Sequence, residues 1–326
     1  MRAGSGRASS EARARRQWAQ AGGGRVRRRG LRSCRVVHQP GSSLLRSRRS
    51  LRDVGGSPSW ERFDSCWARL DRAAEHLHTF GEAWAAFLAS HPYRVFVEIK
   101  DDGSGVVGIR REHPFPQQMP LLVGEFLYEL RATLDNCLHE VAVIHSGQNP
   151  PPGASQLQFP IYSSLFDWAR NEYRLKHLSD EHRQMLERIQ PYRAQRQDLN
   201  CLAMLNHLAR TDRHRTVHLV GACVVEGGLL VKAPPGAVVT ETSKVKQPVI
   251  DEEAGIATLV LHPWSPRQQV ELYPDLVLEV EIAEMAADRP WGSLANRLRA
   301  LHKAVTEYTT GLAAYALGYT EPEIGG

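Results

Sequence analysis

The spacing of the apolar residues changes near Arg215, and this change limits the fold more than any other feature of the sequence. Before Arg215 the apolar residues recur at steps of three and four, most clearly over residues 119–145, as is typical of amphipathic helices. After it they alternate with polar residues, as in half-buried strands, until residues 291–317 return to the helical spacing. Helices, a run of strands and a last helix predict an α+β protein.

The expected elements form a core and a C-terminal region. Residues 57–215 are predicted to be mainly helical, interrupted at 93–110 by a β-hairpin with an Asp- and Gly-rich turn. Residues 216–326 are predicted to be an antiparallel sheet with a closing helix, packed on the core as one unit. Gly81 predicts a break in the first helix. Helices are expected at 60–90, 119–145, 165–173, 179–189, 198–210 and 291–317, and strands at 217–225, 228–233, 237–241, 256–262 and 270–282.

Charge is divided unevenly along the chain. The 326 residues have a net charge of +5 and a pI of about 9.0, values that suggest contact with nucleic acid. Residues 1–56, however, hold fifteen arginines against Glu11 and Asp53, a net charge of +13, whereas residues 57–326 have a net charge of −8. The basic segment has no apolar period, so it cannot offset its ordering entropy by burial and is predicted to be disordered.

Several interpretations of this arginine-rich segment stay open. One is an arm that binds nucleic acid, with its densest part between Arg25 and Arg35. Its composition also fits a transit peptide, and Ser47–Leu51 resembles a twin-arginine signal without the apolar stretch that should follow. Alternatively, translation starts near Val54 and the segment is not made. Nucleic acid is expected as a partner only if the arm belongs to the protein.

The sequence favours neither a metal site nor a cofactor nor a membrane span. With His207 and His218 added, the cluster at Asp212–Arg215 has imidazole and carboxylate groups that suit zinc or iron, but it straddles the change from helix to strand and we expect no metal there. Its five cysteines are scattered and form no Cys-x-x-Cys pair, which argues against a disulfide framework and a structural zinc. No Gly-x-Gly-x-x-Gly or P-loop motif follows a strand, so a nucleotide-binding Rossmann fold is not expected. No apolar run approaches the length of about 18 residues that spans a bilayer. We therefore expect a soluble, cytoplasmic protein with no cofactor.

Arg131, Asp135 and His139 are the first candidate site, because their spacing of four places them on one stripe of the predicted helix at 119–145. Arginine can hold a phosphate while histidine transfers a proton, which is the chemistry of a metal-independent ribonuclease. The stripe resembles the helical Arg–His motif of HEPN nucleases, although seven residues separate Arg131 from His139. The structural interpretation is a salt-bridged stripe at a helix–helix boundary.

Asp212, Arg213, His214 and Arg215 form the second candidate, at the end of the predicted helix 198–210. His214 is a candidate for acid–base chemistry, and Asp212, Arg213 and Arg215 are candidates for binding an anion. The structural interpretation is that the basic residues complement the helix dipole. A row of four carboxylates follows in the last strand, and we expect it to be the solvent-facing side of the sheet. The row consists of Asp275, Glu279, Glu281 and Glu284.

Four short motifs resemble, in the same order, a group of uncharacterised and largely actinobacterial proteins. They are Leu130-Arg131-x-x-Leu134-Asp135, Phe159-Pro160-Ile161, Ile189-Gln190-Pro191-Tyr192 and Leu205-x-x-Leu208-x-x-x-Asp212-x-His214-Arg215. The resemblance implies a recurrent helical core and a shared centre around Asp135, Asp212 and His214, but no activity.

Two functions follow, and the sequence does not decide whether the chain is an enzyme. The first is a non-enzymatic binding module for a protein partner or an anionic ligand. The alternative is a HEPN-like ribonuclease that uses Arg131 and His139.

Overall fold

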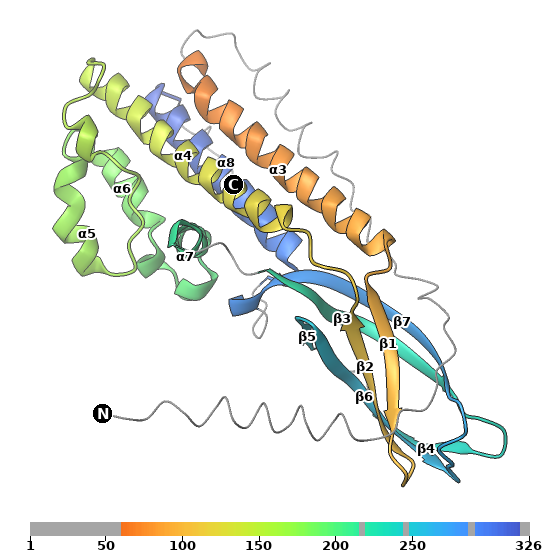
Figure 1. Ribbon diagram of the computed structural model, residues 1–326. Coiled ribbons are helices and arrows are strands. Elements are labelled where there is room, and N and C mark those ends of the chain that lie inside the picture. Colours follow the sequence, from red (N-terminus) through yellow and green to blue (C-terminus); the bar gives the residue numbers. More distant parts are fainter. Residues whose placement is uncertain (1–59, 215–218, 244–247, 286–290, 320–326) are drawn as a thin grey trace, which may run out of the picture. The chain divides into compact units, whose positions relative to one another are not determined.

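The computed structural model describes residues 60–214, 219–243, 248–285 and 291–319 (Figure 1). The arginine-rich segment, Arg215 and Val54 lie outside the described residues. The described chain forms two compact units, a β unit of residues 88–115 and 220–279 and a helical unit built from the rest. Helices and antiparallel sheets confirm the α+β class.

The two units interleave along the chain instead of dividing near residue 215. The hairpin is grouped with the later strands, and the closing helix with the early helices. The physical reason is that a lone hairpin is marginal in water, so the second hairpin strand pairs with the strand at 253–262. An amphipathic helix likewise needs an apolar partner for its buried face.

The β unit contains two sheets. The first has the order β1-β2-β6-β4 and the second the order β5-β3-β7. The β1–β2, β2–β6, β4–β6 and β3–β5 pairings are antiparallel, and the predicted hairpin is confirmed. The strands predicted at 217–225 and 228–233 form one strand. The bounds are β1 Tyr93–Ile99, β2 Ser104–Arg111, β3 Leu219–Lys232, β4 Val238–Thr242, β5 Val249–Ile250, β6 Glu253–His262 and β7 Glu271–Ile282.

The helical unit is built around the longest predicted helix. Its α-helices are α3 Asp64–Ala89, α4 Gln118–Ser146, α5 Leu165–Asn171, α6 Asp180–Arg188, α7 Cys201–His214 and α8 Leu294–Ala316. Short 3-10 helices are η1 Trp60–Phe63, η2 Ala154–Gln156, η3 Glu172–Leu175, η4 Pro191–Arg193, η5 Gln197–Leu199 and η6 Ala283–Met285. Helix α3 continues through Gly81, so the predicted break is wrong, because the packed helix tolerates one glycine without interruption.

Helix α4 is the centre of the helical unit and packs on both α7 and α8. Leu127, Leu130, Leu134 and Leu138 on its inner face are fully buried, and each stabilises the unit by about 1.5–3 kcal/mol. Helix α3 runs antiparallel to α4, since Arg69 pairs with Glu129 at 2.8 Å and the later His76 pairs with the earlier Glu125 at 3.2 Å. Among the described helices, none is long and apolar enough to cross a membrane.

Candidate functional site

The first half of the predicted Arg131–Asp135–His139 stripe is formed. Arg131 is 6% exposed on α4, and its Nη2 lies 3.8 Å from Oδ1 of Asp135. Its Nη1 is buried and has no hydrogen-bond partner. Burial lowers the pKa of Arg131, while the neighbouring charge of Asp135 opposes this change. Arg131 is therefore a buried cation, and its ion pair with Asp135 is long, at 3.8 Å.

Asp135 connects α4 to the loop that follows it. Its Oδ1 accepts a 2.8 Å hydrogen bond from the backbone N–H of Phe159. Burial raises the pKa of Asp135, and the charge of Arg131 and the Phe159 bond act in the opposite direction. The Phe159-Pro160-Ile161 motif is thus held to α4 by a carboxylate, which is a structural role for two of the four motifs.

His139 does not join this pair. Its side chain is 36% exposed, and its Nδ1 lies 3.5 Å from Oε1 of the adjacent Glu140. Among the described residues, no hydrogen bond or ion pair joins it to Arg131 or Asp135. The i, i+4 ion pair expected from the structural interpretation is present, whereas the Arg–Asp–His relay is not assembled.

The end of α7 lies against the same face of α4. The carboxylate of Asp212 is so close to Gly124 that a Cβ there would lie 2.7 Å from Oδ2. The charge of Arg213 lowers the pKa of Arg131 and opposes the rise that burial causes in the pKa of Asp135. Gly124 lies two helical turns before Arg131, so the structure brings Asp212 to the face of α4 that carries Arg131.

Gln190 is a residue that sequence reasoning did not single out. Its side chain is fully buried and donates to the carbonyl oxygens of Leu186, at 2.8 Å, and Pro160, at 3.0 Å. Its Oε1 accepts a 2.9 Å bond from the N–H of Tyr162. The signal was its place inside the Ile189–Tyr192 motif, and its role is to hold residues 160–162 to the end of α6.

A groove runs along the exposed face of α7, with a volume of about 520 Å³. His207, Arg210 and His214 share this face because they are spaced by three and four residues. No carboxylate is among the described lining residues, and none of these three side chains makes an ion pair or a hydrogen bond within the described chain. The lining is completed by Ser163, Ala203, Asn206 and Thr211. His214 thus faces this groove, where it can donate to an anion.

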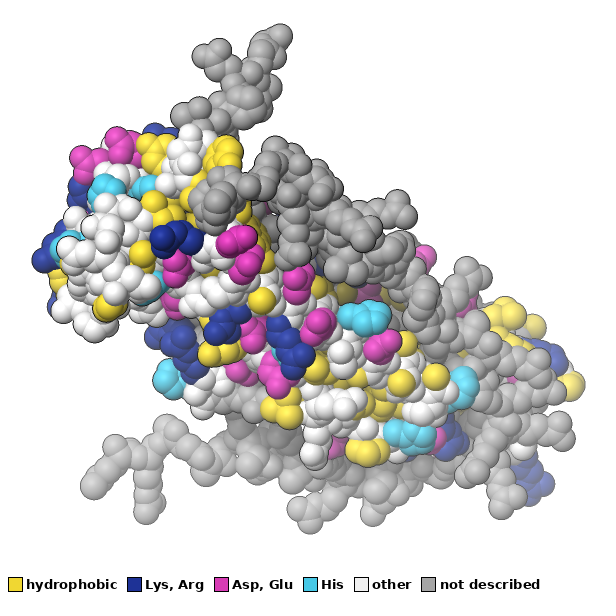
Figure 2. Space-filling model, turned by 90° about the horizontal axis from the view of Figure 1, so that it is seen from above, with side chains coloured by type: hydrophobic (Ala, Val, Ile, Leu, Met, Phe, Trp, Pro, Cys, Tyr) yellow, Lys and Arg dark blue, Asp and Glu magenta, His cyan; other side chains and the backbone are white. Residues whose placement is uncertain are grey.

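The groove belongs to a part of the chain in which basic residues slightly outnumber acidic ones. Figure 2 shows basic and acidic side chains interspersed over the described surface of one face. Residues 160–214, which include the groove, hold nine Arg or Lys and seven Asp or Glu, whereas residues 57–326 as a whole are acidic. Among the described residues, no group of three or more His, Cys, Asp and Glu is arranged to hold a metal.

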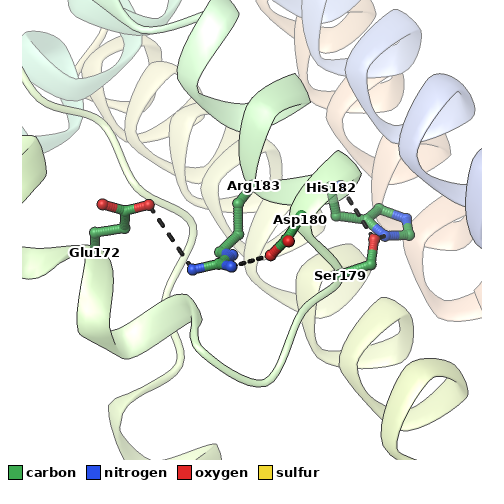
Figure 3. A network of polar contacts seen from close by, with 5 residues as sticks. All are labelled: Glu172, Ser179, Asp180, His182 and Arg183. Atoms are coloured by element: carbon green, nitrogen blue, oxygen red, sulfur yellow. Dashed lines mark hydrogen bonds and ion pairs between the residues drawn. The ribbon is translucent and has the colours of Figure 1, made fainter.

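A second polar network ties η3 to α6 (Figure 3). Arg183 pairs with Asp180, and its Nη1 also lies 3.9 Å from Oε1 of Glu172. Ser179 is the N-cap of α6, because its Oγ accepts from the N–H of His182 at 3.2 Å. These contacts hold the first turn of α6 in place, so we assign them a structural role.

His182 is buried behind this cap. Its Nδ1 lies 2.8 Å from Oγ of Ser179, and its ring meets that of Tyr315 edge-on at 4.9 Å. Burial lowers the pKa of His182, the nearby backbone of Leu312 opposes this shift, and the charge of His145 lowers the pKa further.

The expectation for the carboxylate row of β7 is wrong at one position. Glu281 is fully buried and pairs with Arg297 of α8, which is 1% exposed. The reason is that the end of β7 enters the helical unit, where an arginine meets it. Asp275 is exposed as expected, Glu279 is half-buried, and the side chain of Glu284 lies outside the described residues.

Comparison of the chain with protein-family models, with curated proteins and with solved structures found no match.

Proposed function

We propose that the chain is a non-enzymatic binding module that takes a small oxyanionic ligand in the groove along α7. The observation that carries the proposal is the lining, which combines Arg210, His207 and His214 with no carboxylate among its described members. A guanidinium and two imidazoles suit phosphate or carboxylate oxygens, because charge-assisted hydrogen bonds are the strong ones. The volume of about 520 Å³ is in the range of small-molecule sites.

The surrounding contacts supply a fixed platform for such a groove. Asp135 and Gln190 hold residues 159–162 in place, and Ser163 of the groove follows directly. Asp212 packs α7 against Gly124 of α4. A ligand would therefore meet positions that are already ordered, which reduces the entropy cost of binding.

The test is a calorimetric titration of the full chain with inorganic phosphate and with acetate. Arg210→Gln should weaken binding of the preferred anion by about tenfold or more, since a hydrogen bond to a charged group contributes about 1.5–3 kcal/mol. Arg72→Gln is the matched control, because Arg72 is an exposed arginine of α3 paired with Glu75. Equal affinity of wild type and Arg210→Gln, or no binding of either anion, would contradict the proposal.

An RNA-cleavage assay separates the binding module from the ribonuclease alternative. A nuclease of the HEPN type needs Arg131 and His139 at one phosphate, yet Arg131 is buried and His139 pairs with Glu140. We expect no cleavage of labelled RNA. Cleavage that His139→Ala abolishes would overturn the non-enzymatic assignment.

A further inference from the structure

Among the described strands, β1 is a regular edge strand that contains neither a bulge nor Pro nor Lys. The edges of the two sheets are β1, β4, β5 and β7. Strand β4 has five residues and a bulge between Val239 and Glu241, β5 has two residues, and β7 contains Pro274. Strand β1 has seven residues, no Pro or Lys, and an unbroken register with β2. Proteins block exposed edges with bulges, Pro or Lys, so a regular edge of this length is suited to pairing.

The hydrogen bonds at the two ends of β1 show which backbone groups face outward. The N–H of Lys100 donates to Ser104 O at 2.8 Å, and the N–H of Glu112 donates to Pro92 O at 2.7 Å. In an antiparallel pair, bonded and non-bonded positions alternate along the strand. The even-numbered residues of β1 therefore bond to β2. Tyr93, Val95, Val97 and Ile99 direct their N–H and C=O groups away from β2, toward the open edge.

When two copies of β1 run antiparallel, charged residues of one copy can lie opposite oppositely charged residues of the other, and valines opposite valines. We propose that a second copy of this chain pairs antiparallel with β1, with Phe96 on the two-fold axis. Arg94 then lies opposite Glu98 of the second copy, and Val95 lies opposite its Val97. A two-fold interface requires such reciprocity, because each contact occurs twice. The outward groups of Val95 and Val97 supply the bonded pairs of the new ladder.

The exposure of these side chains fits this pairing. Arg94 and Glu98 are exposed, and Val95 and Val97 are only half-buried at the edge. Nη1 of Arg94 lies 3.4 Å from Oε1 of Glu112 in the same chain, an exposed pair that contributes little and that the contact with Glu98 of the second copy would replace or share. Arg94 and Glu98 occupy non-bonded positions of the new ladder, where facing side chains approach most closely. The ring of Phe96 lies beneath the guanidinium of Arg110, 4.9 Å from its centre, and over Gly108, so it leaves the edge accessible.

The neighbouring registers are less favourable. A shift of two residues in one direction places Arg94 opposite Lys100, which sets like charges against each other. A shift in the other direction places Arg94 opposite Phe96 and leaves Glu98 opposite Pro92. The register centred on Phe96 is the one of the three that joins opposite charges, and charge complementarity therefore selects both the partner and the alignment.

Charge reversal at β1 tests the pairing by light scattering coupled to size-exclusion chromatography of the full chain. The wild type should be a dimer at high protein concentration. Glu98→Arg and Arg94→Glu should each weaken dimerisation by about tenfold or more, because each creates two like-charge pairs. A mixture of the two variants should form a heterodimer, because every pair is then opposite in charge. Glu241→Arg, on the other edge of the same sheet, should stay dimeric.

The possible outcomes distinguish pairing of β1 with a second copy of the chain from pairing with any other partner. A wild type that stays monomeric at all concentrations overturns the proposal, as does a Glu98→Arg variant that dimerises as the wild type does. Failure of the mixed variants to associate overturns the register. Hydrogen exchange gives an independent measurement, since the amides of Val95 and Val97 should become protected as concentration rises while that of Phe96, bonded to β2, should not change.

Discussion

The buried pair of Glu281 and Arg297 is the contact whose loss we expect to destabilise the helical unit most. Both side chains are essentially inaccessible to water, and Oε1 of Glu281 also accepts a 2.8 Å bond from the N–H of Ile282. Nε and Nη1 of Arg297 are buried without a partner, so the guanidinium depends on Glu281 for its stabilisation. Glu281→Gln keeps an oxygen for Ile282 and removes the charge that Arg297 needs.

The cost of this change follows from the burial of the arginine. Breaking a buried ion pair by removing one partner costs about 3–5 kcal/mol, because an uncompensated charge stays in the interior. A whole domain is stable by only about 5–15 kcal/mol, so the single variant should lose a fifth or more of its stability. Replacing both partners, as in Glu281→Leu with Arg297→Met, should cost far less, because no buried charge is left.

Urea unfolding followed by circular dichroism measures both effects on the same scale. The helical signal reports mainly on the unit that contains the pair, and the double variant is the control for the change in shape. A cost below about 1 kcal/mol for Glu281→Gln, the range of exposed ion pairs, would refute the argument that the pair is desolvated. A double variant that is as unstable as the single one would show that packing, and not charge, sets the cost.

Three further changes test the platform under the groove. Gly124→Ala places a methyl group 2.7 Å from Oδ2 of Asp212 and should cost about 1–3 kcal/mol in urea unfolding. Gln190→Leu leaves three buried backbone groups unpaired and should cost about 3 kcal/mol or more, whereas an exposed Gln184→Leu should not. Burial lowers the pKa of His182 below its ordinary 6.5. The stabilisation that the neutral ring gives the folded state is therefore fully present above about pH 6.5 and is lost as the pH falls below that value. Stability measured against pH should therefore decline below about pH 6.5, and His182→Phe should reduce the slope.

Periodicity was enough to predict the long elements, because burial of one face decides the state of a long segment, but the two-residue strand β5 was not predicted. The helix at 118–146 and the hairpin at 93–111 lie within two residues of their expected bounds. The grouping of the elements was not predictable, since pairing of β2 with β6 joins segments about 150 residues apart, and no local pattern encodes such a partner. Glu281 was misplaced for the same reason, because its burial depends on an arginine in another element.

The sequence predicted which residues would lie near one another in the candidate site better than it predicted what each of them does. Asp135, Gln190 and Asp212 all lie in or beside the four motifs, and the structure uses them to hold backbone and helices together. Side chains engaged in this way cannot also meet a ligand without leaving buried groups unpaired, which is costly. Among the described residues, the side chains of Arg210, His207 and His214 make no hydrogen bond or ion pair that holds the fold together. We therefore propose that a ligand binds on the exposed face of α7, which includes His214 of the fourth motif, and not at the Arg131–Asp135 pair that the spacing first suggested.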